Sequence, residues 1–323
     1  MNNILITGGA GYIGSHVAER LIKDKFKVFI IDNLSTGSKK LINNKATFYK
    51  LDITQTNQVK NILLSRNIDT VIHLAGKLNV LESENHPELY YKNNVQGTKS
   101  LLDACKNSFV NTFIFSSSCT VYGNKKKFFK ENSKKFPISY YGKTKLECEN
   151  LIKNYFKGNF CILRYFNVAG SSASKKIGQI NTNDQLFKKL TSEVLKKKPV
   201  FNIYGFDYKT KDGTCVRDYI HINDLVDVHL KVLKKLNCTN KSTIINCGYG
   251  YGYSVLQIIK EFMKFTKNKT VTINYLKKRK GDVEIAVANV SKLKKYLYWK
   301  PRFNNLKKII KDCILWEKKL KKL

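Results

Sequence analysis

The chain has 323 residues, enough for about two domains, and its 42% hydrophobic and 12% aromatic content excludes a disordered protein. No apolar run approaches the roughly 20 residues that a membrane-spanning helix needs, so we expect no membrane association. The net charge of +35 makes nucleic-acid binding a hypothesis that the rest of the sequence must test.

The basic residues are mostly lysines scattered along the whole length, which is typical of a solvated surface rather than of a nucleic-acid groove. No arginine-rich or RNP-like motif accompanies them. We therefore expect no specific nucleic-acid partner. The chain has six arginines: Arg20, Arg66, Arg164, Arg217, Arg279 and Arg302.

The eight cysteines stand apart, and no two form a Cys-x-x-Cys pair. This pattern indicates neither a zinc site nor a redox motif, so we expect no metal. It favours reduced thiols in a cytoplasmic protein. The first residues, "MNNILITGGAGYIG", have no basic region and pass straight into glycines, which predicts a first strand rather than a signal peptide.

The segment "NILITGGAGYIGSHVAERLI" predicts a strand, a glycine turn and a helix. A tight turn requires Gly8, close approach of a pyrophosphate requires Gly11, and helix–strand packing favours Gly14. The strand before the glycines and the helix after them distinguish a dinucleotide site from a chance glycine triad.

The next apolar run, "KVFIIDNLSTG", ends in Asp32, eighteen residues after Gly14. An acid at this strand end accepts hydrogen bonds from the adenosine ribose hydroxyls and repels a 2′-phosphate. It predicts NAD rather than NADP, although Lys39 and Lys40 nearby keep the alternative open.

Further apolar runs at 47–52, 70–75, 112–118 and 160–167 alternate with helical stretches. This alternation predicts a doubly wound parallel sheet, which binds ligands at the carboxyl ends of its strands. The residues at these ends are Asp52, Ala75, Gly76 and Ser116 to Ser118.

The segment "SYYGKTK" contains one Tyr/Lys couple at helical spacing, Tyr141 and Lys145, which share one face of a helix. In a lysine-rich chain such a couple also arises as a solvated helix face. The surrounding motifs must decide between the two interpretations.

Seven segments occur in an order that spans nearly the whole chain: "GGAGYIGSH", "DNLSTG", "FSSSCTVYG", "YYGKTK", "RYFNVAG", "DGTCVRDYIHINDL" and "RKGD". They resemble the UDP-glucose 4-epimerases, a group of extended short-chain dehydrogenases/reductases. The resemblance implies an α/β fold with a doubly wound parallel-sheet Rossmann domain and a smaller C-terminal α/β substrate domain. It places the NAD-binding domain at 1–167, with 218–248 returning to it, and the substrate domain at 168–217 and 249–323. It also implies a UDP-hexose substrate and a homodimer formed through helices of the first domain.

The resemblance implies that Tyr141, Lys145 and Ser118 are catalytic. Inverting the C4 hydroxyl of a hexose without breaking a C–O bond requires removing a hydride to NAD and returning it, while a base takes the hydroxyl proton. Free tyrosine has a pKa of about 10 and is a poor base at neutral pH. Lowering that pKa by about three units requires roughly 4 kcal/mol, which we expect from Lys145 and the positively charged nicotinamide ring.

The remaining site residues also follow from the resemblance. The cofactor contacts are Gly8, Gly11, Tyr12, Ile13, Gly14, Asp32, Asn33, Asp52, Ile53, Leu74, Ala75, Gly76, Asn93, Ser116, Tyr141, Lys145 and Phe166. The substrate contacts are Ser118, Thr120, Tyr141, Asn167, Gln185, Leu186, Tyr204, Arg217, Arg279, Asp282 and Ala286. In this set the two arginines would bind the diphosphate, and the planar fork of arginine suits that role. Asp282 would bind the uridine ribose.

Two positions depart from the family pattern. After "HLAG" the chain reads "KLNV", so Leu78 occupies the place of an NAD-contacting lysine and Lys77 is displaced by one. Ala286 stands where the family has a bulky gate. We therefore hypothesise that the protein also interconverts UDP-GlcNAc and UDP-GalNAc, unless Val287 or Tyr204 closes the space.

Two classes of alternative remain. One is another nucleotide-sugar epimerase, or a 4,6-dehydratase, of the same fold. A dehydratase needs an Asp-Glu pair after the strand-end Ser/Thr, where this chain has Cys119 and Thr120. The other is a non-catalytic NAD- or RNA-binding relative, against which the intact Tyr141, Lys145 and Ser118 argue.

Overall fold

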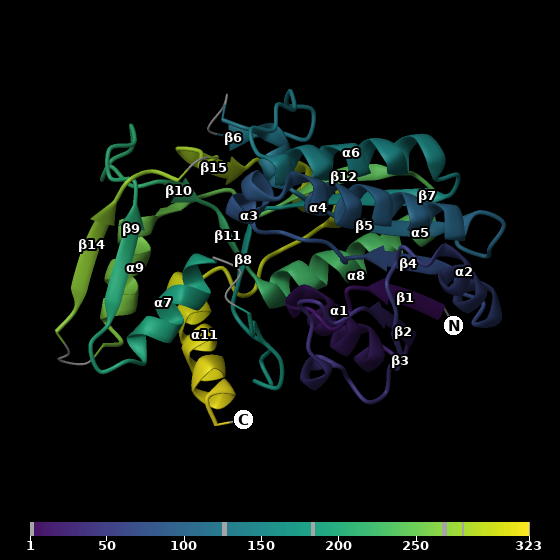
Figure 1. The fold of residues 1–323 in the computed structure, drawn as a ribbon, viewed down its shortest axis with the longest axis horizontal. Helices are drawn as coiled ribbons and strands as arrows, with labels where there is room; N and C mark the ends of the chain where they lie inside the picture. Colours follow the sequence, from purple (N-terminus) through teal and green to yellow (C-terminus); the bar gives the residue numbers. More distant parts are fainter. Residues whose placement is uncertain (1–2, 125–127, 182–184, 267–269, 280, 323) are drawn as a thin grey trace.

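A seven-stranded parallel sheet forms the larger part of the molecule in the computed structural model, which describes residues 3–124, 128–181, 185–266, 270–279 and 281–322 (Figure 1). The strand order is β12-β7-β5-β4-β1-β2-β3, the doubly wound arrangement predicted from the sequence. The strands are β1 (Asn3–Thr7), β2 (Lys27–Asp32), β3 (Thr47–Lys50), β4 (Thr70–His73), β5 (Thr112–Ser118), β7 (Asn159–Tyr165) and β12 (Thr243–Cys247).

Helices cover both faces of this sheet. Successive strand residues point to opposite faces, so Ile4 and Ile6 join one hydrophobic cluster and Leu5 joins another. The first cluster contains residues of α1 (Tyr12–Lys23) and α8 (Ile222–Thr239). The second contains residues of α2 (Thr56–Ser65), α5 (Gly97–Cys105) and α6 (Tyr140–Tyr155). Burial on both faces explains why the strands are nearly continuous apolar runs.

Helix α6 carries the predicted Tyr/Lys couple. Ser139 caps its start, because the Ser139 Oγ accepts a hydrogen bond of 3.1 Å from the backbone N–H of Gly142. The face that bears Lys145 is buried. The solvated-face interpretation of the couple is therefore wrong.

The segment between β4 and α5 has a structure that the sequence patterns did not predict. It contains α3 (Val80–Asn85), α4 (Pro87–Tyr90) and a π-helix, η2 (Tyr91–Gln96). Such π-helical turns are rare and occur frequently at functional sites. Here the turn brings the side chains of Asn93 and Asn94 to the backbone N–H of Lys77, just beyond the end of β4.

Three smaller sheets build the rest of the molecule. The first has the order β13-β10-β15-β6, and the other two pair β11 with β8 and β14 with β9. Their strands are β6 (Phe128–Phe129), β8 (Asn167–Ala169), β9 (Val200–Tyr204), β10 (Val216–Arg217), β11 (Tyr219–His221), β13 (Tyr253–Ser254), β14 (Thr272–Leu276) and β15 (Ile285–Ala288). The accompanying helices are α7 (Leu186–Val194), α9 (Val255–Met263), α10 (Ser291–Leu297) and α11 (Leu306–Leu320), with short 3-10 turns η1 (Lys39–Leu41) and η3 (Cys119–Tyr122).

Figure 1 shows β9, β14, α7 and α9 to the left of the large sheet. The strand β12 and the helix α8 lie within 218–248, and β12 pairs with β7 in the large sheet. The boundaries of a NAD-binding and a substrate domain stay a prediction.

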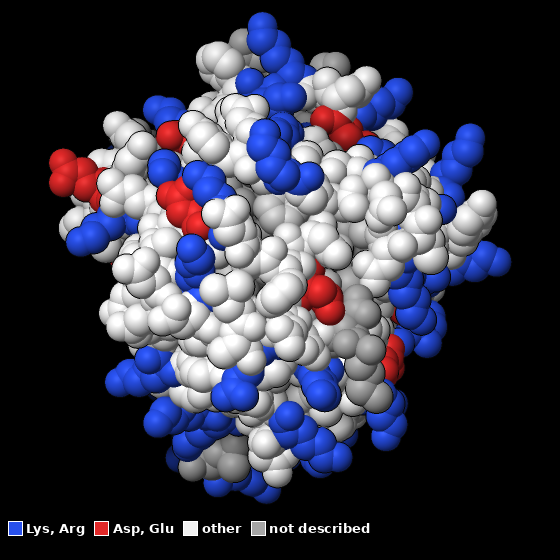
Figure 2. Space-filling view, turned by 90° about the vertical axis from the view of Figure 1, so that its right-hand side faces the viewer, with Lys and Arg blue, Asp and Glu red and all other residues white. Residues whose placement is uncertain are grey.

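The surface carries lysine and arginine side chains over much of its extent. On the face shown in Figure 2 they are separated by uncharged residues and do not merge into one block. The lack of a specific nucleic-acid partner stays a prediction. Within the described ranges, no helix is long and apolar enough to cross a membrane.

Candidate active site

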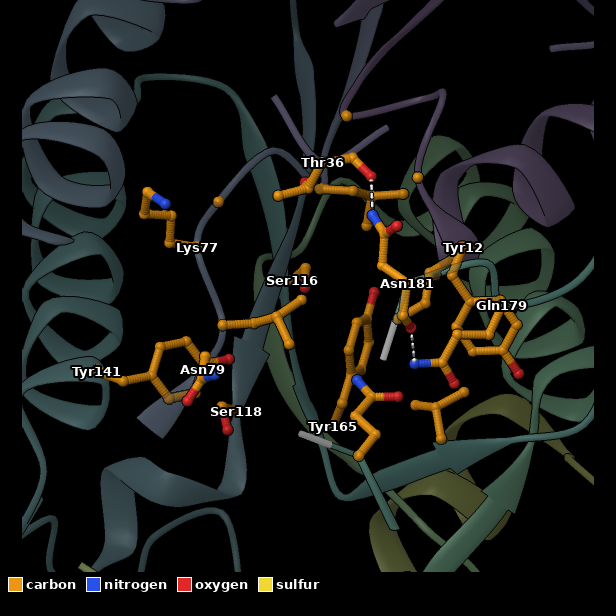
Figure 3. Close-up of a pocket in the computed structure, with 18 of the residues that line it drawn as sticks. Tyr12, Thr36, Lys77, Asn79, Ser116, Ser118, Tyr141, Tyr165, Gln179 and Asn181 are labelled. Atoms are coloured by element: carbon orange, nitrogen blue, oxygen red, sulfur yellow. Dashed lines mark hydrogen bonds between the residues drawn. The ribbon is translucent and has the colours of Figure 1, made fainter. Parts of the chain in front are cut away.

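A cavity of about 450 Å³ lies along the carboxyl ends of the large sheet's strands. Its volume is within the range of about 300–1,000 Å³ typical of small-molecule sites. The glycine turn and the ends of β2, β4 and β5 form one wall, and residues from α7, β9 and β10 form the other. Figure 3 shows side chains from both walls pointing into the space between them.

The glycine turn at one end of the cavity fits the diphosphate of a dinucleotide. A Cβ atom on Gly14 would lie 2.2 Å from the carbonyl oxygen of Gly8, so a side chain cannot be accommodated there. Gly8 has a φ of +72°, which favours glycine. Helix α1 begins at Tyr12 without a side-chain cap, which leaves its first backbone N–H groups available to an anion.

Asp32, predicted to bind the adenosine ribose, is the last residue of β2 and lines the cavity. Its Oδ2 accepts a 3.0 Å hydrogen bond from the N–H of Ala10, and its Oδ1 accepts a 2.8 Å bond from the N–H of Leu34. Burial raises the pKa of this carboxyl group, and the two backbone hydrogen bonds oppose that shift. A carboxylate has about four acceptor positions, so two remain for ribose hydroxyls. Beside it, Asn33 donates a 2.7 Å hydrogen bond to Asp52, and both line the cavity.

Tyr141 and Ser118 meet in the middle of the cavity. Tyr141 reaches it from α6, and Ser118 lies at the end of β5 (Figure 3). Burial raises the pKa of Tyr141 well above its usual range, and a hydrogen bond with Ser118 lowers it. The Ser118 Oγ also accepts a 3.0 Å hydrogen bond from the hydroxyl of Thr120. The tyrosine therefore needs a nearby positive charge before it can act as a base.

Lys145 supplies one such charge. Its Nζ donates a 2.8 Å hydrogen bond to the carbonyl oxygen of Ser116 and lies 6.0 Å from the centre of the Tyr141 ring. Burial lowers the pKa of Lys145 to about 8, while Cys148 and Glu149 oppose the shift. The group is therefore mostly protonated at neutral pH. An ammonium has three donors, so two remain after the bond to Ser116.

The opposite wall carries the two predicted phosphate-binding arginines. The Arg217 Nη2 lies 3.5 Å from the Oδ1 of Asp282, and the guanidinium of Arg279 lies 3.8 Å from the centre of the Tyr204 ring. Stacking of this kind leaves the in-plane donors of an arginine usable. Among the described residues, the Gln185 Oε1 is buried without a hydrogen-bond partner, so a polar ligand could satisfy it.

All the predicted site residues except Ala286 line this one cavity, including Gln185 and Leu186. Ala286 is buried in β15, where its Cα pairs with that of Arg217, and it does not line the cavity. Its role as a gate stays a prediction. Among the described residues, no group of three His, Cys, Asp or Glu side chains is placed to hold a metal ion.

Several lining residues were not predicted from the sequence. Lys77, left without an assigned contact, lies with its Nζ 3.5 Å from the Oε1 of Glu82. Asn79 caps α3, and the pattern Asn-x-x-Glu that it forms with Glu82 is a helix-start signal that could have identified it. Gln179 and Asn181 also line the cavity, and they carry no periodic or motif signal of their own. Thr36 and Tyr165 line it too and lie inside the quoted segments "DNLSTG" and "RYFNVAG", but they were not singled out.

Comparisons with known proteins place the chain in a family. Residues 4–248 match the model of the NAD dependent epimerase/dehydratase family. The chain is 39% identical over 322 residues to the UDP-glucose 4-epimerase of Lactobacillus helveticus, which covers 98% of this chain and 97% of that protein. The chain therefore belongs to the NAD dependent epimerase/dehydratase family, and the resemblance to the UDP-glucose 4-epimerases is confirmed.

Solved structures agree with this assignment. The UDP-glucose 4-epimerase of Stenotrophomonas maltophila, with bound NAD and formylated UDP-arabinopyranose, is similar with a TM-score of 0.91 and 31% identity, covering 100% of this chain and 99% of that one. The UDP-Glc/GlcNAc 4-epimerase of Campylobacter jejuni has a TM-score of 0.84 and 35% identity, covering 99% and 100%. The predictions of a Rossmann-type fold and of NAD as the cofactor are confirmed.

Proposed function

We propose that this protein is a NAD-dependent 4-epimerase that interconverts UDP-glucose and UDP-galactose. One observation carries the proposal: Tyr141 and Ser118 open into a single cavity that also contains the glycine turn and the arginines Arg217 and Arg279. A dinucleotide on the glycine turn and a nucleotide sugar on the arginines would meet at Tyr141.

The residues of the chain have distinct roles in this reaction. NAD supplies a reversible hydride acceptor. Tyr141 takes the proton of the C4 hydroxyl and later returns it, and Ser118 hydrogen-bonds the tyrosine in either state. Lys145 contributes the positive charge that stabilises the phenolate.

Inversion at C4 also requires that the oxidised sugar rotate in the cavity, so that its other face is presented, while its nucleotide stays bound. The phosphate-binding arginines suit this requirement, because they can hold the diphosphate at a distance from the reacting carbon. We propose that the hexose itself is held by few contacts, so that both of its faces can reach Tyr141.

A 4,6-dehydratase of the same fold is the alternative, but this chain lacks the acid/base pair that such an enzyme needs. The residues after Ser118 are Cys119 and Thr120, and burial raises the pKa of Cys119 to about 12. A thiol with that pKa stays protonated at neutral pH and cannot replace a carboxylate as a base.

We further propose that the enzyme accepts 2-acetamido sugars, because Ala286 leaves less bulk near Arg217 than a tyrosine would. The similarity to the Campylobacter jejuni UDP-Glc/GlcNAc 4-epimerase is compatible with this specificity.

A homodimer is the proposed assembly. The helices on the α6 side of the sheet carry exposed apolar side chains that a partner could cover: Leu89 on α4, Tyr91 on η2 and Tyr155 on α6. Sedimentation equilibrium of the purified protein tests this assembly. A cytoplasmic location is proposed from the eight cysteines, all of them described and all free thiols.

The function is tested by NMR of UDP-glucose, UDP-galactose and their N-acetyl forms, each incubated with the purified NAD-loaded protein. We expect either UDP-hexose to give a mixture of both epimers. A protein that binds UDP and NAD but leaves all four sugars unchanged would contradict the proposal.

A further inference from the structure

Three consecutive residues at the end of β5 each contact α6. Ser116 accepts the hydrogen bond from Lys145, Ser117 donates a 2.7 Å hydrogen bond to the Oε1 of Glu149, and Ser118 hydrogen-bonds Tyr141. The three α6 residues are four apart in sequence, so they lie on one face of the helix, a turn from each other. Two of these contacts involve the reacting groups, and the third involves Glu149.

Glu149 forms a fully buried ion pair with Arg164 of β7. The Arg164 Nε lies 2.8 Å from Oε1 and the Nη2 lies 2.6 Å from Oε2, and both side chains have no exposed surface. The Nη1 of Arg164 donates to the hydroxyl of Tyr122 at 2.8 Å and to the carbonyl oxygen of Glu131 at 2.9 Å. The pair thus connects α6 to β5, to β7 and to the segment after η3.

A buried ion pair of this kind is weak evidence for stability, because removing two charges from water costs about as much as their attraction returns. Its bidentate geometry does restrict how the helix can lie, since two parallel bonds fix both distance and orientation. An apolar pair at the same place would allow α6 to slide or rotate against β5.

We propose that Glu149 is a positioning residue for the reaction: paired with Arg164 and Ser117, it fixes α6 along β5 so that Tyr141 faces Ser118 and Lys145 lies beside both. This proposal rests on the proposed epimerase function, because a loss of turnover can be measured only if the protein turns over UDP-galactose. A misplacement of about 1 Å at a reacting group can cost about 10²-fold in rate.

The surroundings of Tyr141 make its titration a reporter of this geometry. The titratable groups that face it are Lys145 and Cys148 of α6, Cys119 of η3, Tyr90 of α4 and Tyr165 of β7. Burial raises the pKa of both thiols and both phenols, so they are neutral at physiological pH. Lys145 is then the one charged group of this set, and it moves with Tyr141 because both lie on α6. Ser118 lies on β5, so a displacement of α6 that breaks the hydrogen bond between Ser118 and Tyr141 removes a contact that lowers the pKa of Tyr141, and that pKa rises.

The test uses the double variant Glu149→Gln/Arg164→Met in the NAD-loaded protein. Replacing both partners removes opposite charges together, so the core contains no unpaired ion. The titration of Tyr141 is followed by the ultraviolet absorbance of its phenolate, as the difference from the same protein with Tyr141→Phe. Turnover of UDP-galactose and the affinity for UDP are measured alongside.

We expect kcat to fall by about 10²-fold with the affinity for UDP unchanged, and the pKa of Tyr141 to be higher than in the wild type. The matched control is Lys153→Met, whose Nζ lies 3.7 Å from the same carboxylate on the solvent side and which should leave both readouts unchanged. A folded double variant with wild-type kcat and wild-type titration would overturn the proposal.

If the double variant does not fold, Ser117→Ala takes its place, because this substitution removes one hydrogen bond to Glu149 and leaves the ion pair intact. It should shift the Tyr141 titration in the same direction, and an unshifted titration overturns the proposal. A wild type that does not turn over UDP-galactose would contradict the proposed function instead, and the titration would still decide the role of Glu149.

Discussion

The Nζ of Lys145 donates a 2.8 Å hydrogen bond to the carbonyl oxygen of Ser116. This bond ties the lysine of α6 to β5, the strand that ends in Ser118. This contact holds the ammonium group in the cavity, 6.0 Å from the ring centre of Tyr141. The arrangement explains how a tyrosine whose pKa is raised by burial can still be a base when the cavity provides positive charge.

Replacing Tyr141 with phenylalanine should lower kcat by at least about 10²- to 10⁴-fold, the usual contribution of a general acid–base group. The affinity for UDP should persist, because Arg217 and Arg279 lie on the opposite wall. Turnover of UDP-galactose and calorimetry of UDP binding measure the two effects. Tyr140→Phe is the control, since Tyr140 is 41% exposed and should remain active. Turnover by the Tyr141 variant at the wild-type rate would show that the base is another group.

A chain of hydrogen bonds links residues that line the cavity at the end where adenosine is predicted to bind, and we expect it to slow NAD release. The Trp316 Nε1 donates to the carbonyl oxygen of Gln179 at 2.8 Å, and the Gln179 Nε2 donates to that of Asn181 at 3.0 Å. Asn181 in turn donates its side-chain amide to the carbonyl oxygen of Thr36 (Figure 3). A typical hydrogen bond contributes about 0.5–1.5 kcal/mol, so Asn181→Ala should accelerate NAD dissociation by about 2- to 10-fold.

Displacement of NAD by excess unlabelled cofactor, followed in stopped flow, measures this rate. The matched control is Asn57→Ala on α2, an exposed asparagine that does not line the cavity. Equal dissociation rates for the Asn181 variant and the control would mean that the hydrogen-bond chain does not retain the cofactor.

These residues also show what the sequence could and could not predict. Gly8 and Asp32 follow from local spacing, because each depends on one strand end. Spacing also places Tyr141 and Lys145 on one helix face, but their catalytic role was assigned only through the family resemblance. Arg217 and Arg279 were assigned only through a family motif, since nothing in their local pattern says that they face the same cavity as Tyr141. The contact between Asn181 and Thr36 joins residues 145 positions apart in loops without periodicity, so no local pattern could predict it.

The π-helix η2 was not predicted for a different reason. Its segment, "YKNNVQ", has the composition of an ordinary helix, while the side-chain amide of Asn94 donates hydrogen bonds to the carbonyl oxygen of Lys77 and to the hydroxyl of Thr144, both distant in sequence. Tertiary contacts decide such a local irregularity, and a single sequence does not reveal them.

Three buried histidines should make the protein unstable in mild acid. Burial lowers the pKa of His16 to about 4, of His73 to about 3 and of His229 to about 4. Below about pH 6.5 the unfolded chain binds protons that the folded protein excludes, so each histidine lowers the free energy of unfolding by about 1.4 kcal/mol per pH unit. Asp218, whose pKa burial raises to about 6, and Asp32, whose pKa burial also raises, act in the opposite sense, but they are two groups against three.

Urea unfolding at several pH values between about 7 and about 5 measures this dependence. His229→Gln should make the stability less dependent on pH, whereas His86→Gln, at an exposed position, should leave the dependence unchanged. A free energy of unfolding that stays constant over this range would refute the assignment of the histidines as buried and neutral.

The size of residue 286 should control the acceptance of acetamido sugars. Ala286→Tyr is expected to lower the turnover of UDP-GalNAc more than that of UDP-galactose, because added bulk next to Arg217 would compete with the acetamido group for space. Turnover of both sugars by wild type and variant is the measurement. A wild-type protein that does not turn over UDP-GalNAc, or an Ala286→Tyr variant that turns it over at the wild-type rate, would contradict this specificity.

In the proposed reaction the protein inverts C4 by taking a hydride from the sugar and returning it to the same carbon. The most direct measurement is NMR of UDP-glucose that carries deuterium at C4, incubated with the purified protein while the absorbance of NADH is recorded. We expect UDP-galactose that retains deuterium at C4, with no accumulation of NADH beyond the bound cofactor. Loss of the deuterium to solvent, or release of NADH in proportion to the sugar consumed, would contradict it.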